Sequence, residues 1–148
     1  MARFAQLVVG STFDGGRRSV GETEIVEFAS RYDPQWFHTD PARARESRWG
    51  GLIASGWMTC AIAMQLAVTS VLHDSESIGS PGVEQIKWPH PVRPGDELRL
   101  RMVVLESRIS RSGTVGVVRW RWLLINQNDT TVLDLVATSL FEIQKRRD

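Results

Sequence analysis

An acid and a histidine stand five positions apart in the segment YDPQWFHTD, which covers residues 32–40. They are Asp33 and His38, and a carboxylate and an imidazole that meet in one site can orient a water molecule and exchange protons with it. Aromatic residues, which prefer burial, stand before and between them: Tyr32, Trp36 and Phe37. We therefore predict that Asp33 and His38 form a catalytic acid–base pair and that the aromatic side chains exclude bulk water from it.

The same residues also allow a purely structural interpretation. Asp33 is followed by Pro34, and an aspartate before a proline is typical of a helix start, because the carboxylate caps free amides and proline fits the first helical position. Asp40, which also precedes a proline, is expected to cap a short helix at Ala42–Ser47 in this way. Taken alone, the pattern would favour capping for Asp33 as well; the segments that follow it along the chain favour catalysis.

The longest apolar segment, residues 50–72, contains no charged residue. Its length would allow a membrane span, but two glycines open it, several Ser, Thr and Gln residues dilute it, and its flanks lack positive clusters and aromatic belts. A helix that is apolar on nearly every side is otherwise buried in a protein core. We predict one buried central helix at about Ser55–Leu72.

The rest of the chain supplies a preceding helix and a following sheet. Apolar residues at helical spacing predict an amphipathic helix from Gly21 that ends before Asp33. After a loop at 73–82 the pattern alternates, as in strands, and tight turns separate four such segments: Val83–Trp88, 97–109, 114–126 and 131–143. An antiparallel meander that follows one apolar helix must wrap around it, which predicts an α+β hot-dog fold.

Length and charge limit the classes of function. The chain has 148 residues, so we expect a single domain over residues 1–148. Its formal net charge of +1 argues against a nucleic-acid or membrane partner, and the C-terminal QKRRD is expected to be a solvated tail. One cysteine and no secretory signal suit a reducing, cytoplasmic location.

Three segments together resemble one family. FASRYDPQWFHTDPARA, then GGLIASGWMT, then PVRPGDELRLRM are similar to the MaoC-like acyl dehydratases, relatives of (R)-specific enoyl-CoA hydratases, over nearly the whole chain. The sharpest part is Asp33 and His38 at their spacing, followed by the glycine-rich entry to the central helix. The stricter hydratase signature, Gly-Asp-x-Asn-Pro-x-His, has the same spacing but an asparagine that this sequence lacks.

The resemblance implies reversible hydration of a trans-2-enoyl-CoA to a (R)-3-hydroxyacyl-CoA, without a metal or redox cofactor. It also implies a homodimer, or a higher homo-oligomer, with active sites near the subunit interface. Asp33 and His38 match the family's catalytic pair. Ser55 and Gly56 match the helix start whose backbone amide holds the thioester oxygen, and we expect Trp57 beside them to contact substrate. Ser55 fits a plain helix N-cap as well as it fits a substrate ligand.

The coenzyme A part of the expected substrate carries phosphate groups, which positively charged side chains can bind. Four cations are candidates to bind the coenzyme A phosphates: Lys87, Arg93, Arg108 and Arg111. His73 and His90 have no ligand-like spacing and are expected to be ordinary loop residues, without a zinc site.

Two other functions fit the same fold. A non-catalytic hot-dog protein would bind an acyl-CoA without turnover. A hot-dog acyl-CoA thioesterase would release free thiol, but such enzymes generally need a carboxylate on the central helix, and residues 50–72 contain none.

Overall fold

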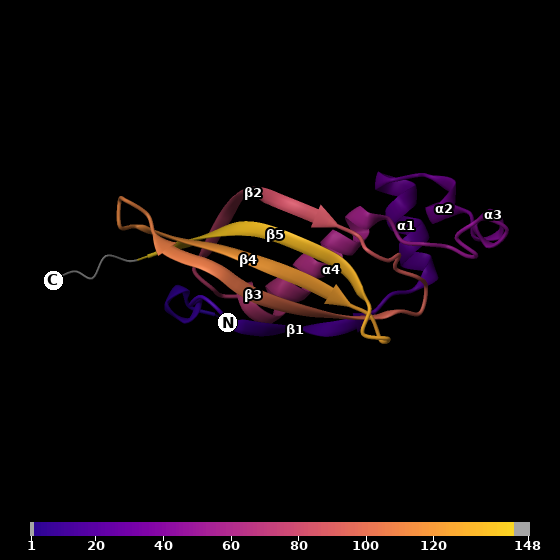
Figure 1. Ribbon diagram of the computed structural model, residues 1–148. Helices are drawn as coiled ribbons and strands as arrows, with labels where there is room; N and C mark the ends of the chain where they lie inside the picture. Colours follow the sequence, from indigo (N-terminus) through magenta and orange to yellow (C-terminus); the bar gives the residue numbers. More distant parts are fainter. Residues whose placement is uncertain (1, 144–148) are drawn as a thin grey trace.

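A five-stranded antiparallel sheet curves along the central helix α4 (Gly56–Ala67) in this computed structural model, which describes residues 2–143 (Figure 1). The strand order is β1-β3-β4-β5-β2, so only the three middle strands form a meander. The strands are β1 (Thr12–Ser19), β2 (Ser77–Lys87), β3 (Glu97–Ile109), β4 (Val115–Ile125) and β5 (Thr131–Glu142). The predicted α+β hot-dog fold is therefore confirmed.

The sheet has an apolar face toward α4 and a charged face away from it. Along β4 the buried residues alternate with Arg119 and Arg121, which project outward; the buried set is Val118, Trp120, Trp122 and Leu124. Met58, Ile62 and Leu66 of α4 join the same core. The alternation of two along the strand and the spacing of three to four along the helix thus bury one face of each element.

The central helix has the expected extent but not the expected burial. Ser55 is its N-cap, and one π-helical turn, Val68–Leu72, continues it to the predicted end. Trp57, Met64 and Val68, however, are 57%, 50% and 42% exposed. The prediction of burial on nearly every side was wrong because the sheet covers only one side of α4.

Two strand boundaries also differ from the expectation. The sequence analysis did not identify β1. β2 begins at Ser77, where a loop to residue 82 was predicted, because the Ser, Pro and Gly residues there are typical of turns. The chain accommodates them as an irregular edge strand, with positive φ angles at Gly79 and Gly82 and shifts in the pairing with β5.

Three short helices form a cap at one end of the sheet (Figure 1). The predicted first helix is α1 (Glu22–Tyr32), and the predicted second helix overlaps α3 (Pro41–Arg45). Asp40 caps α3 as expected, accepting a hydrogen bond from the Arg43 amide at 3.0 Å. The single turn α2 (Trp36–Thr39), which carries His38, was not predicted. One 3-10 turn, η1 (Phe4–Gln6), precedes β1.

Two remaining expectations concern the membrane and the C-terminus. Among the helices within residues 2–143, none combines the length and the hydrophobicity needed to cross a bilayer. The expected solvated tail, residues 144–148, lies outside the residues that the structure describes.

Candidate active site

Asp33 and His38 lie against each other at the junction of α1 and α2. His38 Nε2 is 3.2 Å from Asp33 Oδ2. Asp33 follows the last residue of α1, and its amide donates to the Ala29 carbonyl at 2.8 Å, while the His38 amide donates to Gln35. The turn after α1 and the single turn of α2 therefore bring side chains five positions apart into one pair.

Hydrogen bonds keep the Asp33 carboxylate ionised. Burial acts to raise the pKa of Asp33, but bonds from Gln35 and Ser55 and the interaction with His38 outweigh it, so the pKa lies below its ordinary value. Gln35 Nε2 donates to Oδ1 and Ser55 Oγ donates to Oδ2, each at 2.8 Å. Gln35 stands at the position where the stricter signature has asparagine, and it supplies a side-chain amide there.

The orientation of His38 follows from its other ring nitrogen. Nδ1 lies 2.7 Å from the Ile53 carbonyl oxygen, which can only accept, so Nδ1 carries a hydrogen. Nε2 is then the nitrogen that faces Asp33 and the site. The imidazole is 4% exposed, and the Phe37 ring packs edge-on against it at 4.4 Å. His38 is therefore held in one orientation by a hydrogen bond and by packing.

Ser55 connects the pair to the start of α4. Its side chain is completely buried, its hydroxyl donates to Asp33, and the same oxygen accepts from the Trp57 amide at 3.3 Å. Ser55 was expected to be either a substrate ligand or a helix N-cap, and it does not line the cavity beside the pair. The structure places it behind Asp33, as an N-cap that also holds the carboxylate.

Gly56 begins α4 and lines the cavity. Its amide belongs to the first turn, whose N–H groups have no acceptor within the helix and lie at the positive end of the helix dipole. A Cβ added to Gly56 would lie 2.5 Å from Cε2 of the Trp88 indole. The missing side chain, expected to give substrate access to the backbone, is thus required in the structure by the packing of Trp88.

The cavity has a volume of about 430 Å³, and Asp33, His38 and Gly56 all contribute to its wall. Three tryptophans also line it: Trp49, Trp57 and Trp88. The prediction that aromatic neighbours of Asp33 shelter the pair was wrong for Tyr32, which is 64% exposed and packs on Phe28. Phe37 does pack on His38, but the three tryptophans that line the cavity come from segments distant in sequence, which local spacing does not reveal.

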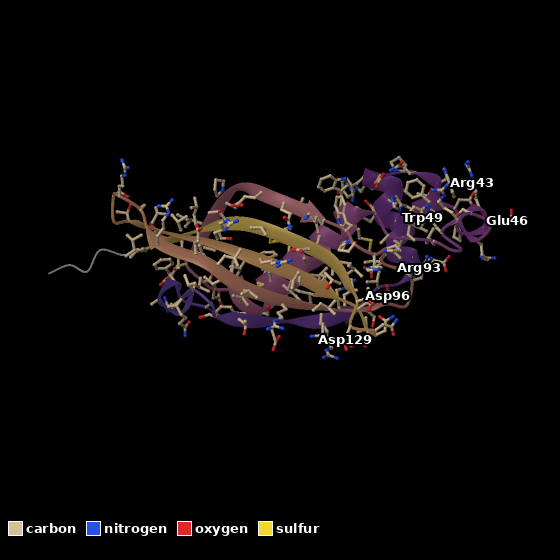
Figure 2. The ribbon with its side chains drawn as sticks, in the orientation of Figure 1. Arg43, Glu46, Trp49, Arg93, Asp96 and Asp129 are labelled. Carbon is tan, nitrogen blue, oxygen red and sulfur yellow. The ribbon has the colours of Figure 1, made fainter. Side chains whose placement is uncertain are left out.

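The predicted phosphate-binding arginines and the loop histidine His90 lie in three different places. Arg93 does not line the cavity; it donates to the Trp49 carbonyl at 2.6 Å, and Figure 2 shows Arg93 near Trp49. Arg111 lies in the turn between β3 and β4, at the end of the sheet opposite the helical cap (Figure 1). His90, expected to be an ordinary loop residue, lines the cavity and bonds to the Thr131 carbonyl at 3.2 Å.

Comparison with known proteins agrees with this architecture. A family model described as a MaoC like domain matches residues 4–121, which include the pair, the start of α4 and most of the sheet. The chain belongs to the MaoC-like family.

Relatives of this MaoC-like chain include one uncharacterized protein and two dehydratases. YdeM of Bacillus subtilis, named as uncharacterized, is 28% identical over 129 residues, 87% of this chain and 91% of that protein. The 3-hydroxyacyl-thioester dehydratase Z of Mycobacterium tuberculosis is 30% identical over 99 residues, 66% of each protein. The crystal structure of a MaoC-like dehydratase from Rhodospirillum rubrum is 39% identical, with a TM-score of 0.85, and covers 93% of this chain and 94% of that one.

Three further observations on this MaoC-like domain concern a thiol, metal-ligand side chains and the central helix. Burial raises the pKa of the Cys60 thiol, so it is protonated at neutral pH and is a poor nucleophile. Over residues 2–143, no three His, Cys, Asp or Glu side chains gather as metal ligands would. No carboxylate is present on α4.

Proposed function

We propose that this protein adds water reversibly to a trans-2-enoyl-CoA to give a (R)-3-hydroxyacyl-CoA. The observation that carries the proposal is the convergence of Asp33, His38 and the first amide of α4 on one cavity. An ionised carboxylate beside an imidazole suits proton transfer, and a helix start suits an anionic oxygen. The dehydratases among the relatives support the same reaction class.

In the first step, Asp33 and His38 hold a water molecule against C3 of the substrate. As the water oxygen bonds to C3, one water proton passes to the pair, and the electrons of the C2–C3 double bond move to the thioester oxygen. The fixed orientation of both side chains means that little rearrangement precedes this proton transfer. We treat the pair as one unit, because strongly interacting groups share their protons.

In the second step, the negative charge on the thioester oxygen returns to C2, which takes a proton from the pair. The Gly56 amide stabilises that charge while it exists, since it lies at the cavity wall and at the positive end of α4. Removing one donor of this kind typically costs about 10²–10³ in kcat. The pair ends with the proton count with which it began, and the product contains one added water.

The test is a panel of trans-2-enoyl-CoA thioesters of increasing length, followed by ultraviolet absorbance and mass spectrometry. The proposal predicts loss of the conjugated-enoyl absorbance and a mass gain of one water on at least one chain length. Release of free coenzyme A would identify a thioesterase. Binding without turnover on every chain length would identify a non-catalytic acyl-CoA-binding protein. Either result would overturn the proposal.

We also infer that a second copy of the chain covers the open side of α4. Trp57 of α4 contacts Trp88, which directly follows the edge strand β2, where Ile78 and Val83 are 54% and 49% exposed. An edge strand presents unpaired backbone groups that another β2 can pair with, and this arrangement makes a homodimer. Light scattering during gel filtration should give twice the mass of one chain; a monomer at micromolar concentration would contradict this.

A further inference from the structure

Most arginines on the sheet are paired with acids: Arg17 with Glu97, Arg99 with Asp129, Arg119 with Glu84 and Arg121 with Asp134. The exceptions, Arg101 and Arg108 of β3, are exposed and form no ion pair within residues 2–143. Arg43, Arg45 and Arg48, which we call the α3 arginines, are exposed and form no ion pair with any residue in the range 2–143. Three like charges within six residues thus stand without counter-charges on the protein.

The α3 arginines directly precede a residue of the cavity wall. Trp49, the residue after Arg48, lines the cavity and is 36% exposed, so it marks the rim. Arg93 fixes this segment by its 2.6 Å bond to the Trp49 carbonyl, and the Arg93 amide is itself bonded to buried Asp96 at 2.9 Å. Figure 2 shows Trp49 between Arg93 and the α3 end of the cap, where Arg43 and Glu46 project outward. The segment is therefore anchored rather than loosely attached.

The geometry of Arg43 leaves its donors available. Its guanidinium stacks over the Trp36 ring at 4.4 Å. Stacking uses the flat face of the group, so the N–H donors around its edge can still bind an anion, and a guanidinium fork matches the oxygens of a phosphate. Glu46 is the one acid in residues 41–49.

We propose that Arg43, Arg45 and Arg48 bind the phosphate groups of the coenzyme A carrier. This inference rests on the proposed function, which places the thioester at Asp33 and Gly56. The coenzyme A carrier must then extend from that point past the rim of the cavity. Trp49 forms part of this rim and directly follows Arg48, the last of the α3 arginines. Arg93 has a different role from the one predicted: it positions this segment. Arg111 lies at the far end of the sheet and takes no part.

The variant Arg45→Gln/Arg48→Gln tests the proposal, since both side chains are exposed and neither forms an ion pair or side-chain hydrogen bond within residues 2–143. The matched control is Arg101→Gln/Arg108→Gln, which removes two exposed arginines of β3 that have no ion pair in the described part of the chain; Arg108 lies near the turn to β4, at the end of the sheet opposite the helical cap (Figure 1). Calorimetry should show that the dissociation constant for coenzyme A rises about tenfold in the α3 variant and stays unchanged in the control. This binding measurement does not depend on turnover, so it separates failure of the phosphate site from failure of the proposed hydration.

Kinetics sharpen the test with two substrates. For crotonyl-CoA the α3 variant should show a KM raised about tenfold with unchanged kcat, the pattern of lost ground-state binding. For the N-acetylcysteamine thioester, which has no phosphate, wild type and variant should agree. In the wild type alone, added salt should weaken coenzyme A binding, because phosphate contacts are screened.

Three results would overturn the proposal. The α3 variant could bind coenzyme A as wild type does. It could lose equally on both thioesters, which would mean that these residues shape the site instead of binding the carrier. It could lose only on a crotonyl-acyl-carrier protein, which would assign the arginines to a protein surface.

Discussion

The sheet and the helical cap use charged residues in opposite ways. On the outer face of the sheet most arginines have an acid partner, as in Arg121 with Asp134 across β4 and β5. In the cap, hydrogen bonds hold Asp33 ionised at a cavity, and the α3 arginines have no acid partner in the part of the chain that is described. Paired charges on the sheet contribute little beyond solubility, whereas held or unpaired charges in the cap are available to a ligand.

Substitutions on the sheet and in the cap should therefore differ in their effect on activity. Changes on the sheet remove contacts that the protein makes with itself in solvent, and water replaces them at small cost. Changes in the cap remove groups that the surrounding structure has oriented for a reacting molecule.

Replacing either member of the pair should nearly abolish hydration. Asp33→Asn keeps the shape of the side chain but cannot take a proton, and His38→Ala removes the other partner. Positioned acid–base groups typically contribute about 10²–10⁴ in rate, so kcat should fall by at least about a hundredfold. The control is Asp40→Asn, the same chemical change at a nearby helix cap, where asparagine caps equally well. Equal activity of Asp33→Asn and Asp40→Asn would contradict a catalytic role for Asp33.

Gly56→Ala should lower both stability and activity, since its Cβ would overlap the Trp88 ring. Overpacking of this kind costs about 1–3 kcal/mol, and displacement of the α4 start would move the amide at the cavity. Gly21→Ala is the comparison, because a Cβ there meets nothing within 4 Å. Thermal unfolding and kcat/KM measure the two effects. A Gly56→Ala protein that equals wild type in both would show that Trp88 does not need this space.

Gln35→Leu should change the pH dependence more than the maximal rate. Gln35 lowers the pKa of Asp33 by donating to it, so loss of that bond raises this pKa toward its ordinary value. The carboxylate then takes up its proton at a higher pH, and the acid limb of the kcat/KM profile should move upward in pH. Gln35→Asn retains an amide donor and should keep the limb close to wild type. An acid limb that does not move in Gln35→Leu would contradict this role.

Arg121→Gln on the sheet should have the smallest effect. Arg121 is 47% exposed and its partner Asp134 is 13% exposed, so the pair is partly screened by solvent; its loss should cost on the order of 1 kcal/mol, and activity should not change. The bond from Arg121 lowers the pKa of Asp134, so the contribution is present above the ordinary carboxyl pKa and is lost as pH falls through the lowered one. Urea unfolding at neutral and acidic pH checks the sign. A large activity loss would place function on the sheet face and contradict the comparison.

Sequence reasoning found what local spacing determines. The pair was identifiable because Asp33 and His38 are separated by one turn, and the hot-dog fold because one uncharged helix precedes alternating strands. The role of Ser55 depends on a contact with Asp33 across 22 residues, and the shelter of the pair depends on Trp49 and Trp88 from separate loops. Such contacts join residues that are distant in sequence, so the periodic pattern of apolar residues does not predict them.

The open side of α4 shows a second limit. Composition predicted a buried helix, because it cannot distinguish burial by the chain's own sheet from burial by another molecule. The incorrect prediction for Arg93 has a similar cause. A cation in a loop near the site can bind either a ligand or a backbone carbonyl, and the sequence does not distinguish the two; in the folded protein Arg93 binds the Trp49 carbonyl.

The most direct test of the account is hydration of trans-2-butenoyl-CoA in oxygen-18-labelled water, with the product analysed by mass and by chirality. The account predicts that the wild type places one labelled hydroxyl on C3 of an (R)-3-hydroxy product, and that Asp33→Asn does so at a rate reduced at least about a hundredfold. Label found in a free carboxylic acid, or equal incorporation by Asp33→Asn, would contradict the claim that Asp33 and His38 add water to the double bond.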